Sequence, residues 1–127
     1  MQVLERILYA EDDEDIQQVA ILALELVGGF KIKTCHNGLE AVSEIEGFKP
    51  QLLLFDVMMP NMDGPSALLK IRELENFKAT PAIFMTAKVQ PEEVNKYMGM
   101  GAIGVIAKPF DPMTLASQIQ EIWEKSQ

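Results

Sequence analysis

Short apolar runs and amphipathic segments follow one another along the whole chain. The runs are rich in Leu, Ile, Val and Phe and end in polar or turn-forming residues, which predicts β-strands. The run Leu52–Phe55 is continuous, as expected for a strand buried on both faces. We expect strands at Leu4–Ala10, Phe30–His36, Gln51–Asp56, Pro81–Met85 and Ile103–Ala107.

Between the strands, apolar residues recur three or four positions apart, which predicts amphipathic helices. Gly28-Gly29 and Pro50 end the first two of these segments. Helices are expected near residues 16–27, 37–48, 65–74, 91–98 and from Asp111-Pro112 onward. Repeated βα units of this length predict a doubly wound α/β fold, in which helices cover both faces of a parallel sheet. We expect one domain over residues 1–127, with no output domain in this chain.

Composition narrows the classes of function. The formal net charge is −8 over 127 residues, which disfavours nonspecific binding to nucleic acid because Lys and Arg neutralise its phosphates. The single cysteine, Cys35, cannot form an internal disulfide, and no apolar run suits a signal peptide or a membrane span. We therefore expect a cytoplasmic protein that binds neither nucleic acid nor membrane directly.

Side chains able to do chemistry stand where the expected strands end. The ends of the first, third, fourth and fifth strands carry, in that order, Glu11 with Asp12, then Asp56, Thr86 and Lys108. The carboxyl ends of parallel strands meet at one edge of the sheet, which is where such folds bind their ligands. These five side chains are therefore expected to converge.

Five consecutive acids, residues 11–15, follow the first strand. Residues 13–15 are expected to complement the positive end of the next helix. Glu11 and Asp12 lie nearer to Asp56, and carboxylates gathered there would repel one another unless a cation joined them. A site with few protein oxygens and space for water and phosphate suits Mg²⁺.

Thr86 or Lys108 alone would indicate only a structural hydroxyl or a solvated charge. Beside three carboxylates, the lysine can pair with phosphoryl oxygens and the hydroxyl can donate a hydrogen bond to one of them. The combination predicts a phosphoryl-transfer site. The peptide bond between Lys108 and Pro109 can be either cis or trans on sequence grounds.

Other kinds of site find little support in the sequence. No Ser/His/Asp triad and no Cys/His metal cluster can be assembled, and residues 10–13 lack the glycines of a dinucleotide-binding loop. His36 is expected at the surface, and Cys35 is expected to be a small buried thiol.

Four segments together resemble the receiver domains of two-component response regulators. They are Ile7–Asp13, Leu54–Gly64, Met85–Ala87 and Lys108–Phe110, in the family's order and spread over essentially the whole chain. The acid pair, the strand-end Asp with its Pro-x-x-Asp-Gly turn, the Thr-Ala and the Lys-Pro form a specific signature only in combination. The resemblance implies a flavodoxin-like (βα)5 sheet of order 2-1-3-4-5.

The resemblance also implies a role for each acid. Asp56 matches the acceptor of a phosphoryl group from a phosphohistidine, carried by a sensor histidine kinase or a histidine phosphotransfer protein. Glu11, Asp12, Asp56 and the backbone carbonyl of Met58 match the positions that hold Mg²⁺, with Asp12 as a direct ligand and Glu11 acting through water.

Thr86 matches the family's switch hydroxyl, and Lys108 matches the lysine that pairs with the phosphoryl group. Such a domain is not an enzyme acting on a substrate, because it catalyses only its own phosphorylation and dephosphorylation. Phosphorylation would then change the face formed by the fourth helix, the fifth strand and the fifth helix, where a downstream protein is expected to bind.

This chain departs from the family at Val105, where many receivers carry an aromatic residue that reports activation. Val105 leaves a second interpretation open, namely a receiver-like interaction domain that works without phosphorylation. A Mg²⁺-dependent phosphatase is a third, but Met58 occupies the position of the second aspartate that such enzymes use. Met58 and Lys88 also match the two positions that flank the path of hydrolytic water.

Overall fold

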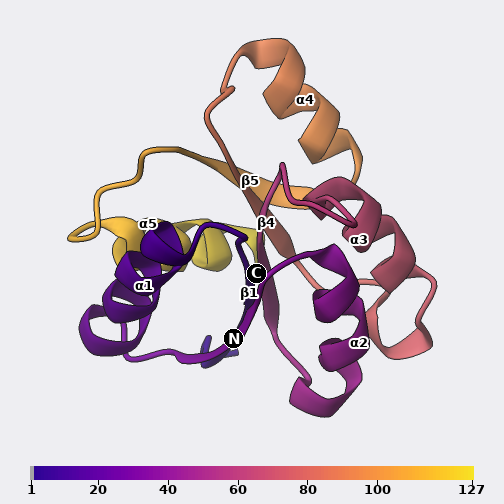
Figure 1. Ribbon diagram of the computed structural model, residues 1–127, viewed down its shortest axis with the longest axis horizontal. Helices are drawn as coiled ribbons and strands as arrows, with labels where there is room; N and C mark the ends of the chain where they lie inside the picture. The colour runs from indigo at the N-terminus through magenta and orange to yellow at the C-terminus, as the bar shows by residue number, and fades with distance from the viewer. Residues whose placement is uncertain (1) are drawn as a thin grey trace.

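Five parallel strands form one sheet in the order β2-β1-β3-β4-β5 (Figure 1). The computed structural model describes residues 2–127, so Met1 lies outside the described part. The strands are β1 (Arg6–Ala10), β2 (Lys31–Cys35), β3 (Leu52–Asp56), β4 (Ala82–Thr86) and β5 (Ala102–Ala107). The expected strands and the flavodoxin-like strand order are both confirmed.

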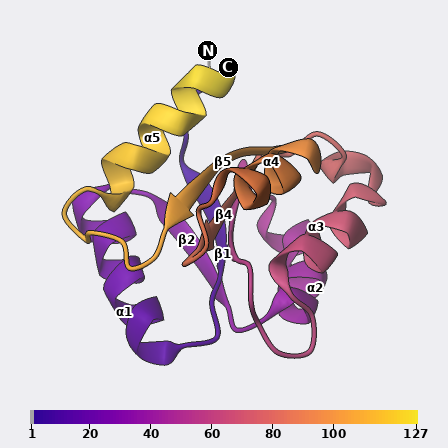
Figure 2. The same cartoon turned by 90° about the horizontal axis from the view of Figure 1, so that it is seen from above.

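The helices cover both faces of the sheet. They are α1 (Glu14–Leu22) continuing into the π-helical η1 (Ala23–Val27), α2 (Gly38–Phe48), α3 (Gly64–Arg72), the 3₁₀ turn η2 (Glu75–Phe77), α4 (Pro91–Gly99) and α5 (Leu115–Ser126). Helices α1 and α5 lie on one face, and α2 and α3 lie side by side on the other (Figures 1 and 2). The doubly wound arrangement is therefore present as expected.

The central strands carry apolar residues on both faces because helices cover both. One core, beneath α1 and α5, contains Ile7, Tyr9, Leu54 and Met85. The other core, beneath α2, α3 and α4, contains Leu8, Leu53, Phe55 and Phe84. Every residue of β3 is buried, which accounts for the continuous apolar run that precedes Asp56.

Side-chain caps begin three of the helices that follow strands at the carboxyl edge of the sheet. The carboxylate of Asp13 accepts hydrogen bonds from the Asp15 and Ile16 amides and caps α1. Asn37 caps α2 and Asp63 caps α3 in the same way. Residues 13–15 thus stabilise the start of α1, as the sequence predicts.

The last helix begins at Leu115, later than the expected start near Asp111. The side chain of Asp111 accepts a hydrogen bond from the Met113 amide at 2.9 Å, and its carbonyl accepts one from Leu115 at 3.0 Å. Residues 112–114 therefore form a turn that precedes the helix. At the other end of α5, the Trp123 indole donates to the Gln2 carbonyl at 3.3 Å, so the two termini lie together (Figure 2).

None of the helices within residues 2–127 has both the length and the apolar character needed to cross a bilayer.

Candidate functional site

The strand register places the four expected strand ends at one level of the sheet. Ala10 pairs with Phe55, Asp56 pairs with Met85, and Thr86 pairs with Ala107. The next residues along β1 and β5 are the site residues Glu11 and Lys108, which therefore emerge at the same carboxyl edge as Asp56 and Thr86.

Three carboxylates gather at this edge. Glu11, Asp12 and Asp56 each offer one oxygen, and these oxygens lie within 4.8 Å of one another. Glu11 is 1% exposed and Asp56 is 6% exposed, whereas Asp12 lies open to solvent. An all-oxygen cluster with one open side fits Mg²⁺, which keeps several water ligands.

Lys108 bridges two of these carboxylates. Its ammonium nitrogen lies 2.8 Å from Glu11 Oε1 and 3.2 Å from Asp56 Oδ1. The Lys108-Pro109 peptide bond, which the sequence left open, is cis. The lysine thus supplies a positive charge within the buried part of the acid cluster.

The electrostatic environment makes Asp56 an unusual carboxylate. The pKa of Asp56 is raised to about 6, mainly by burial and then by the negative charge of Glu11, while Lys108 opposes both effects. Burial alone would lower the pKa of Lys108, but the pairing with Glu11 and Asp56 outweighs burial and raises it. The ion pairs therefore hold the lysine charged and only partly relieve the repulsion between the two acids.

Thr86 lies between the strands that carry Asp56 and Lys108, and it is 6% exposed. Its hydroxyl oxygen accepts a hydrogen bond from the Lys88 amide at 3.1 Å. Its carbonyl accepts one from the Lys108 amide at 2.9 Å. Because the hydroxyl acts as an acceptor in this contact, its proton stays available for another oxygen.

Comparison with known proteins shows which family the protein belongs to. The model of the response regulator receiver domain matches residues 7–120. The chain belongs to that family. Receiver domains are the signalling domains of two-component systems, so this receiver domain is a signalling module.

The relatives are response regulators from diverse organisms. The chain is 33% identical over 111 residues to the probable transcriptional regulator ycf29 of Porphyra purpurea, which covers 87% of the chain and 53% of the relative. It is 33% identical over 126 residues to the CpxR homolog of Haemophilus influenzae, covering 97% of the chain and 52% of the relative. The chain therefore spans about half the length of these two relatives.

Solved structures give the same result for the fold. The chemotaxis response regulator CheY4 of Vibrio cholerae superposes with a TM-score of 0.86 at 28% identity, covering 94% of this chain and 99% of that one. The receiver domain of the Francisella response regulator 1452 superposes with a TM-score of 0.84 at 26% identity, covering 97% and 99%.

One polar residue that supports the site of this receiver domain has no clear signal in the sequence. The side-chain amide of Gln17, on α1, donates to the carbonyls of Glu11 at 3.0 Å and Cys35 at 3.2 Å. Gln17 is buried, so it ties the ends of β1 and β2 to the first helix. Cys35 is buried as expected, and His36 is exposed beside Glu40.

Gly64 is required where the loop after Asp56 enters α3. A Cβ atom at Gly64 would lie 2.3 Å from the Asp56 carbonyl oxygen and 3.3 Å from the Phe84 ring. The glycine of the Pro-x-x-Asp-Gly turn therefore lets the helix begin directly against the strand that carries Asp56.

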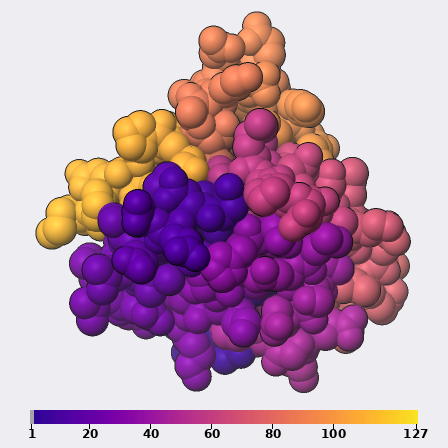
Figure 3. All heavy atoms as spheres, viewed as in Figure 1, coloured from indigo at the N-terminus to yellow at the C-terminus, as the bar shows by residue number. Residues whose placement is uncertain are grey.

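A groove of about 890 Å³ leads from the surface to Asp56. It is lined by Asp56, Met58, Thr86, Lys88, Tyr97 and Lys108, among others. Figure 3 shows the magenta loop after β3 emerging between the indigo end of β1 and the orange α4. The groove opens the carboxylate cluster to solvent on the side of α4.

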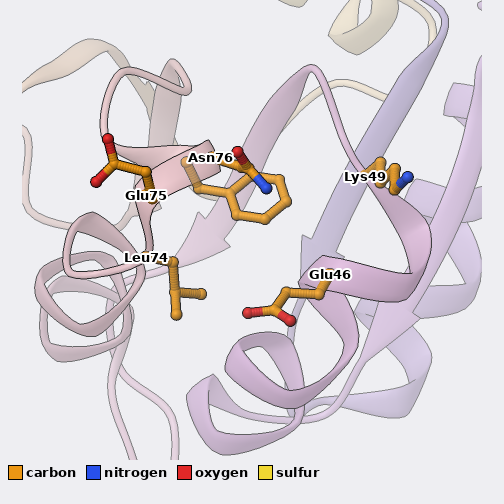
Figure 4. Close-up of a pocket in the computed structure, with 6 residues that line it drawn as sticks. Glu46, Lys49, Leu74, Glu75 and Asn76 are labelled. Carbon is orange, nitrogen blue, oxygen red and sulfur yellow. The ribbon is translucent and has the colours of Figure 1, made fainter.

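A second hollow of about 620 Å³ lies away from this chemistry. Glu46 and Lys49, at the end of α2, line it on one side, and Leu74, Glu75 and Asn76 line it on the other (Figure 4). These residues precede β3 and β4 in the chain, so the hollow lies at the amino edge of the sheet, opposite the carboxylate cluster.

Proposed function

We propose that this receiver domain accepts a phosphoryl group on Asp56 from a phosphohistidine in a Mg²⁺-dependent reaction. The donor is a sensor histidine kinase or a histidine phosphotransfer protein. The observation that carries the proposal is the buried Asp56 carboxylate beside both an acid cluster and the Lys108 ammonium. This arrangement provides an acceptor, a cation site and a charge partner within one corner of the sheet.

The residues of the chain would divide the work as follows. Asp12, Asp56 and the Met58 carbonyl would hold Mg²⁺ directly, and Glu11 would do so through water. The ion would offset negative charge on the transferring group. The Asp56 carboxylate attacks phosphorus, and the histidine nitrogen of the donor leaves with the electron pair of the bond that breaks. Lys108 then exchanges its contact with Asp56 for one with a phosphoryl oxygen.

Thr86 would convert the chemistry into a change of surface. Its hydroxyl proton is available for a phosphoryl oxygen, and moving toward that oxygen would break its contact with the Lys88 amide. The β4–α4 loop would shift with it. The populations of the conformations of the face formed by α4, β5 and α5 would then change. A downstream protein that binds this face would detect the change.

Val105 affects how this face can respond. It is half-buried and packs against the same core as Phe84 and Tyr97. The Tyr97 ring lies 5.1 Å from the Phe84 ring, between centroids, and is buried. A valine has no ring to rotate, so we assign the response to the loop after Thr86 and leave Tyr97 without a switch role.

The proposed partners of the domain itself are proteins. Some relatives are named as transcriptional regulators, but this chain spans about half of their length. Its net charge of −8 disfavours contact with nucleic acid phosphates, so we propose no direct nucleic-acid or membrane partner. A cytoplasmic location suits the single cysteine, which has no partner for an internal disulfide. We propose one receiver domain over residues 1–127.

Two other functions predict a different number of phosphoryl groups incorporated or turned over per protein molecule. The phosphorylation-independent interaction domain, which Val105 leaves open, would incorporate no phosphoryl group. A phosphatase turns over a phosphate ester many times, but Met58 leaves such an enzyme without its second acid. Incubation with acetyl phosphate and, separately, with p-nitrophenyl phosphate distinguishes the three. We expect stoichiometric incorporation from the first and no sustained release of nitrophenol from the second.

Met58 and Lys88 are proposed to shield the phosphoryl group from water. Both line the groove that reaches Asp56, and the Met58 side chain is 77% exposed, which leaves it free to cover the group. The Met58→Ala/Lys88→Ala variant is expected to lose its phosphoryl group severalfold faster, because water reaches phosphorus more easily. The decay of the phosphorylated protein, followed by intact mass, measures the rate; an unchanged decay would refute the shielding role.

A further inference from the structure

The loop that follows Asp56 is held by few hydrogen bonds. At its ends, the Val57 amide donates to the Met85 carbonyl and the Gly64 amide donates to the Val57 carbonyl, both at 3.0 Å. Within the described residues 2–127, one hydrogen bond joins residues 58–62 to another element: the Gly38 amide donates to the Met62 carbonyl at 2.9 Å. The end of the loop that leads into α3 is therefore tied to the start of α2.

Gly38 makes this contact possible because it lacks a side chain. A Cβ atom there would lie 2.6 Å from the Met62 carbonyl oxygen and 2.9 Å from both Ala67 Cβ and Met62 Cγ. The φ angle of Gly38 is not left-handed, so the position requires glycine for space rather than for conformation. Any other residue must push the loop, or α3, away from α2.

The start of α2 is itself a fixed support. The Gly38 amide belongs to the first turn of the helix, where amides have no partner within the helix, and the Met62 carbonyl provides one. Asn37 is buried and caps the helix: its side-chain oxygen accepts a hydrogen bond from the Glu40 amide at 2.9 Å. Ala41 and Ile45 are fully buried against the sheet, so the helix cannot easily follow a displaced loop.

We propose that Gly38 is a positioning residue for phosphoryl transfer. By holding Met62 against α2, it restrains the loop that carries the Met58 carbonyl, which the proposed function assigns to the same cation as Asp12 and Asp56. Gly38 touches neither the phosphoryl group nor the metal and acts only through the loop. This inference rests on the proposed function, because it concerns the Mg²⁺ site of that function.

Gly38→Ala tests the inference by its effect on metal affinity. Displacing a group that supports a metal ligand typically weakens binding by roughly 10- to 100-fold, and we expect a rise of that size in the Mg²⁺ dissociation constant. Isothermal titration calorimetry with MgCl₂ measures the constant, and urea denaturation without Mg²⁺ measures the change in stability separately. The rate of phosphorylation by acetyl phosphate at low Mg²⁺ should fall, with recovery as Mg²⁺ is raised.

Gly47→Ala is the matched control, because it adds the same methyl group to the same helix. A Cβ atom at Gly47 has no neighbour within 4 Å, so the dissociation constant should not change. The variant Gly38→Ala/Ala67→Gly removes one of the three close contacts and should recover part of the affinity. It also keeps the test informative if Gly38→Ala alone fails to fold.

The outcomes separate this inference from the proposed function. Weakened Mg²⁺ binding in Gly38→Ala, with partial recovery in the double variant, supports the positioning role. A destabilised Gly38→Ala protein that binds Mg²⁺ as tightly as the wild type overturns it, because glycine would then serve stability alone. A wild-type protein that neither binds Mg²⁺ nor becomes phosphorylated overturns the proposed function, and this inference with it.

Discussion

Lys108→Ala is expected to destabilise the protein strongly in the absence of Mg²⁺ and to slow its phosphorylation. Removing the ammonium leaves Glu11 and Asp56, both buried, without the positive charge that bridges them. Removing one partner of a buried ion pair lowers the free energy of unfolding by about 3 kcal/mol. Without its charge partner for the phosphoryl oxygens, the variant should be phosphorylated roughly 100-fold more slowly.

Urea denaturation with and without Mg²⁺ measures the effect on stability. Saturating Mg²⁺ should restore part of the loss, because a cation bound by the acids reduces the same repulsion. Lys88→Ala is the control, since Lys88 lines the same groove but is exposed to solvent. If Lys108→Ala is no less stable than Lys88→Ala, the ion pairs do not stabilise the folded protein as described.

Asp56→Asn is expected to have the opposite effect on stability while abolishing phosphorylation. The folded protein raises the pKa of Asp56 from 3.8 to about 6, chiefly through burial and then through Glu11. Between these two values the folded state binds more protons than the unfolded state, so the stability of the wild type falls as pH rises. At neutral pH the charged carboxylate destabilises the fold by about 2 to 3 kcal/mol, which asparagine would relieve.

The difference between the two proteins should therefore depend on pH in a defined way. It should be small below the unfolded pKa of 3.8 and should reach its full size above about 6. Urea denaturation in the absence of Mg²⁺ across this range provides the comparison. Asp12→Asn, which changes an exposed acid of the same cluster, should stabilise the protein less. Equal stability of wild type and Asp56→Asn at every pH would contradict the account of Asp56.

The fold could be predicted from sequence because burial in a parallel sheet leaves simple patterns. The apolar run Leu52–Phe55 indicates a strand covered on both faces, and the structure buries all of it. The start of α5 could not be placed in the same way. Asp111 has the character of a helix cap, but its hydrogen bonds form a separate turn before Leu115.

The gathering of site residues could also be predicted, because strand ends in a parallel sheet meet at one edge. The contacts among them could not. The sequence suggested that the acids need a cation, and the structure shows Lys108 already bridging Glu11 and Asp56. Whether a lysine contacts one carboxylate or two depends on distances in the folded protein, and the positions of residues in the sequence do not specify these distances.

The supports of the site were the least predictable part. Gln17 looks like any polar residue of an amphipathic helix, yet it is buried and binds the carbonyls that end β1 and β2. Gly38 looks like a turn residue after Asn37, yet it is needed because α2 and the loop after Asp56 approach closely. Both roles arise from contacts between segments far apart in the chain, where local patterns carry no information.

The central claim is that Asp56 accepts a phosphoryl group with the help of Mg²⁺. The most direct test is the intact mass of the protein after incubation with acetyl phosphate, with and without Mg²⁺, beside Asp56→Asn. We expect one phosphoryl group on the wild type, dependent on Mg²⁺ and absent from the variant. Repeating the measurement at early times and with a stable phosphoryl mimic, beryllofluoride, guards against rapid hydrolysis. A wild type that gains neither adduct, or an Asp56→Asn protein that gains the phosphoryl group equally well, would contradict the claim.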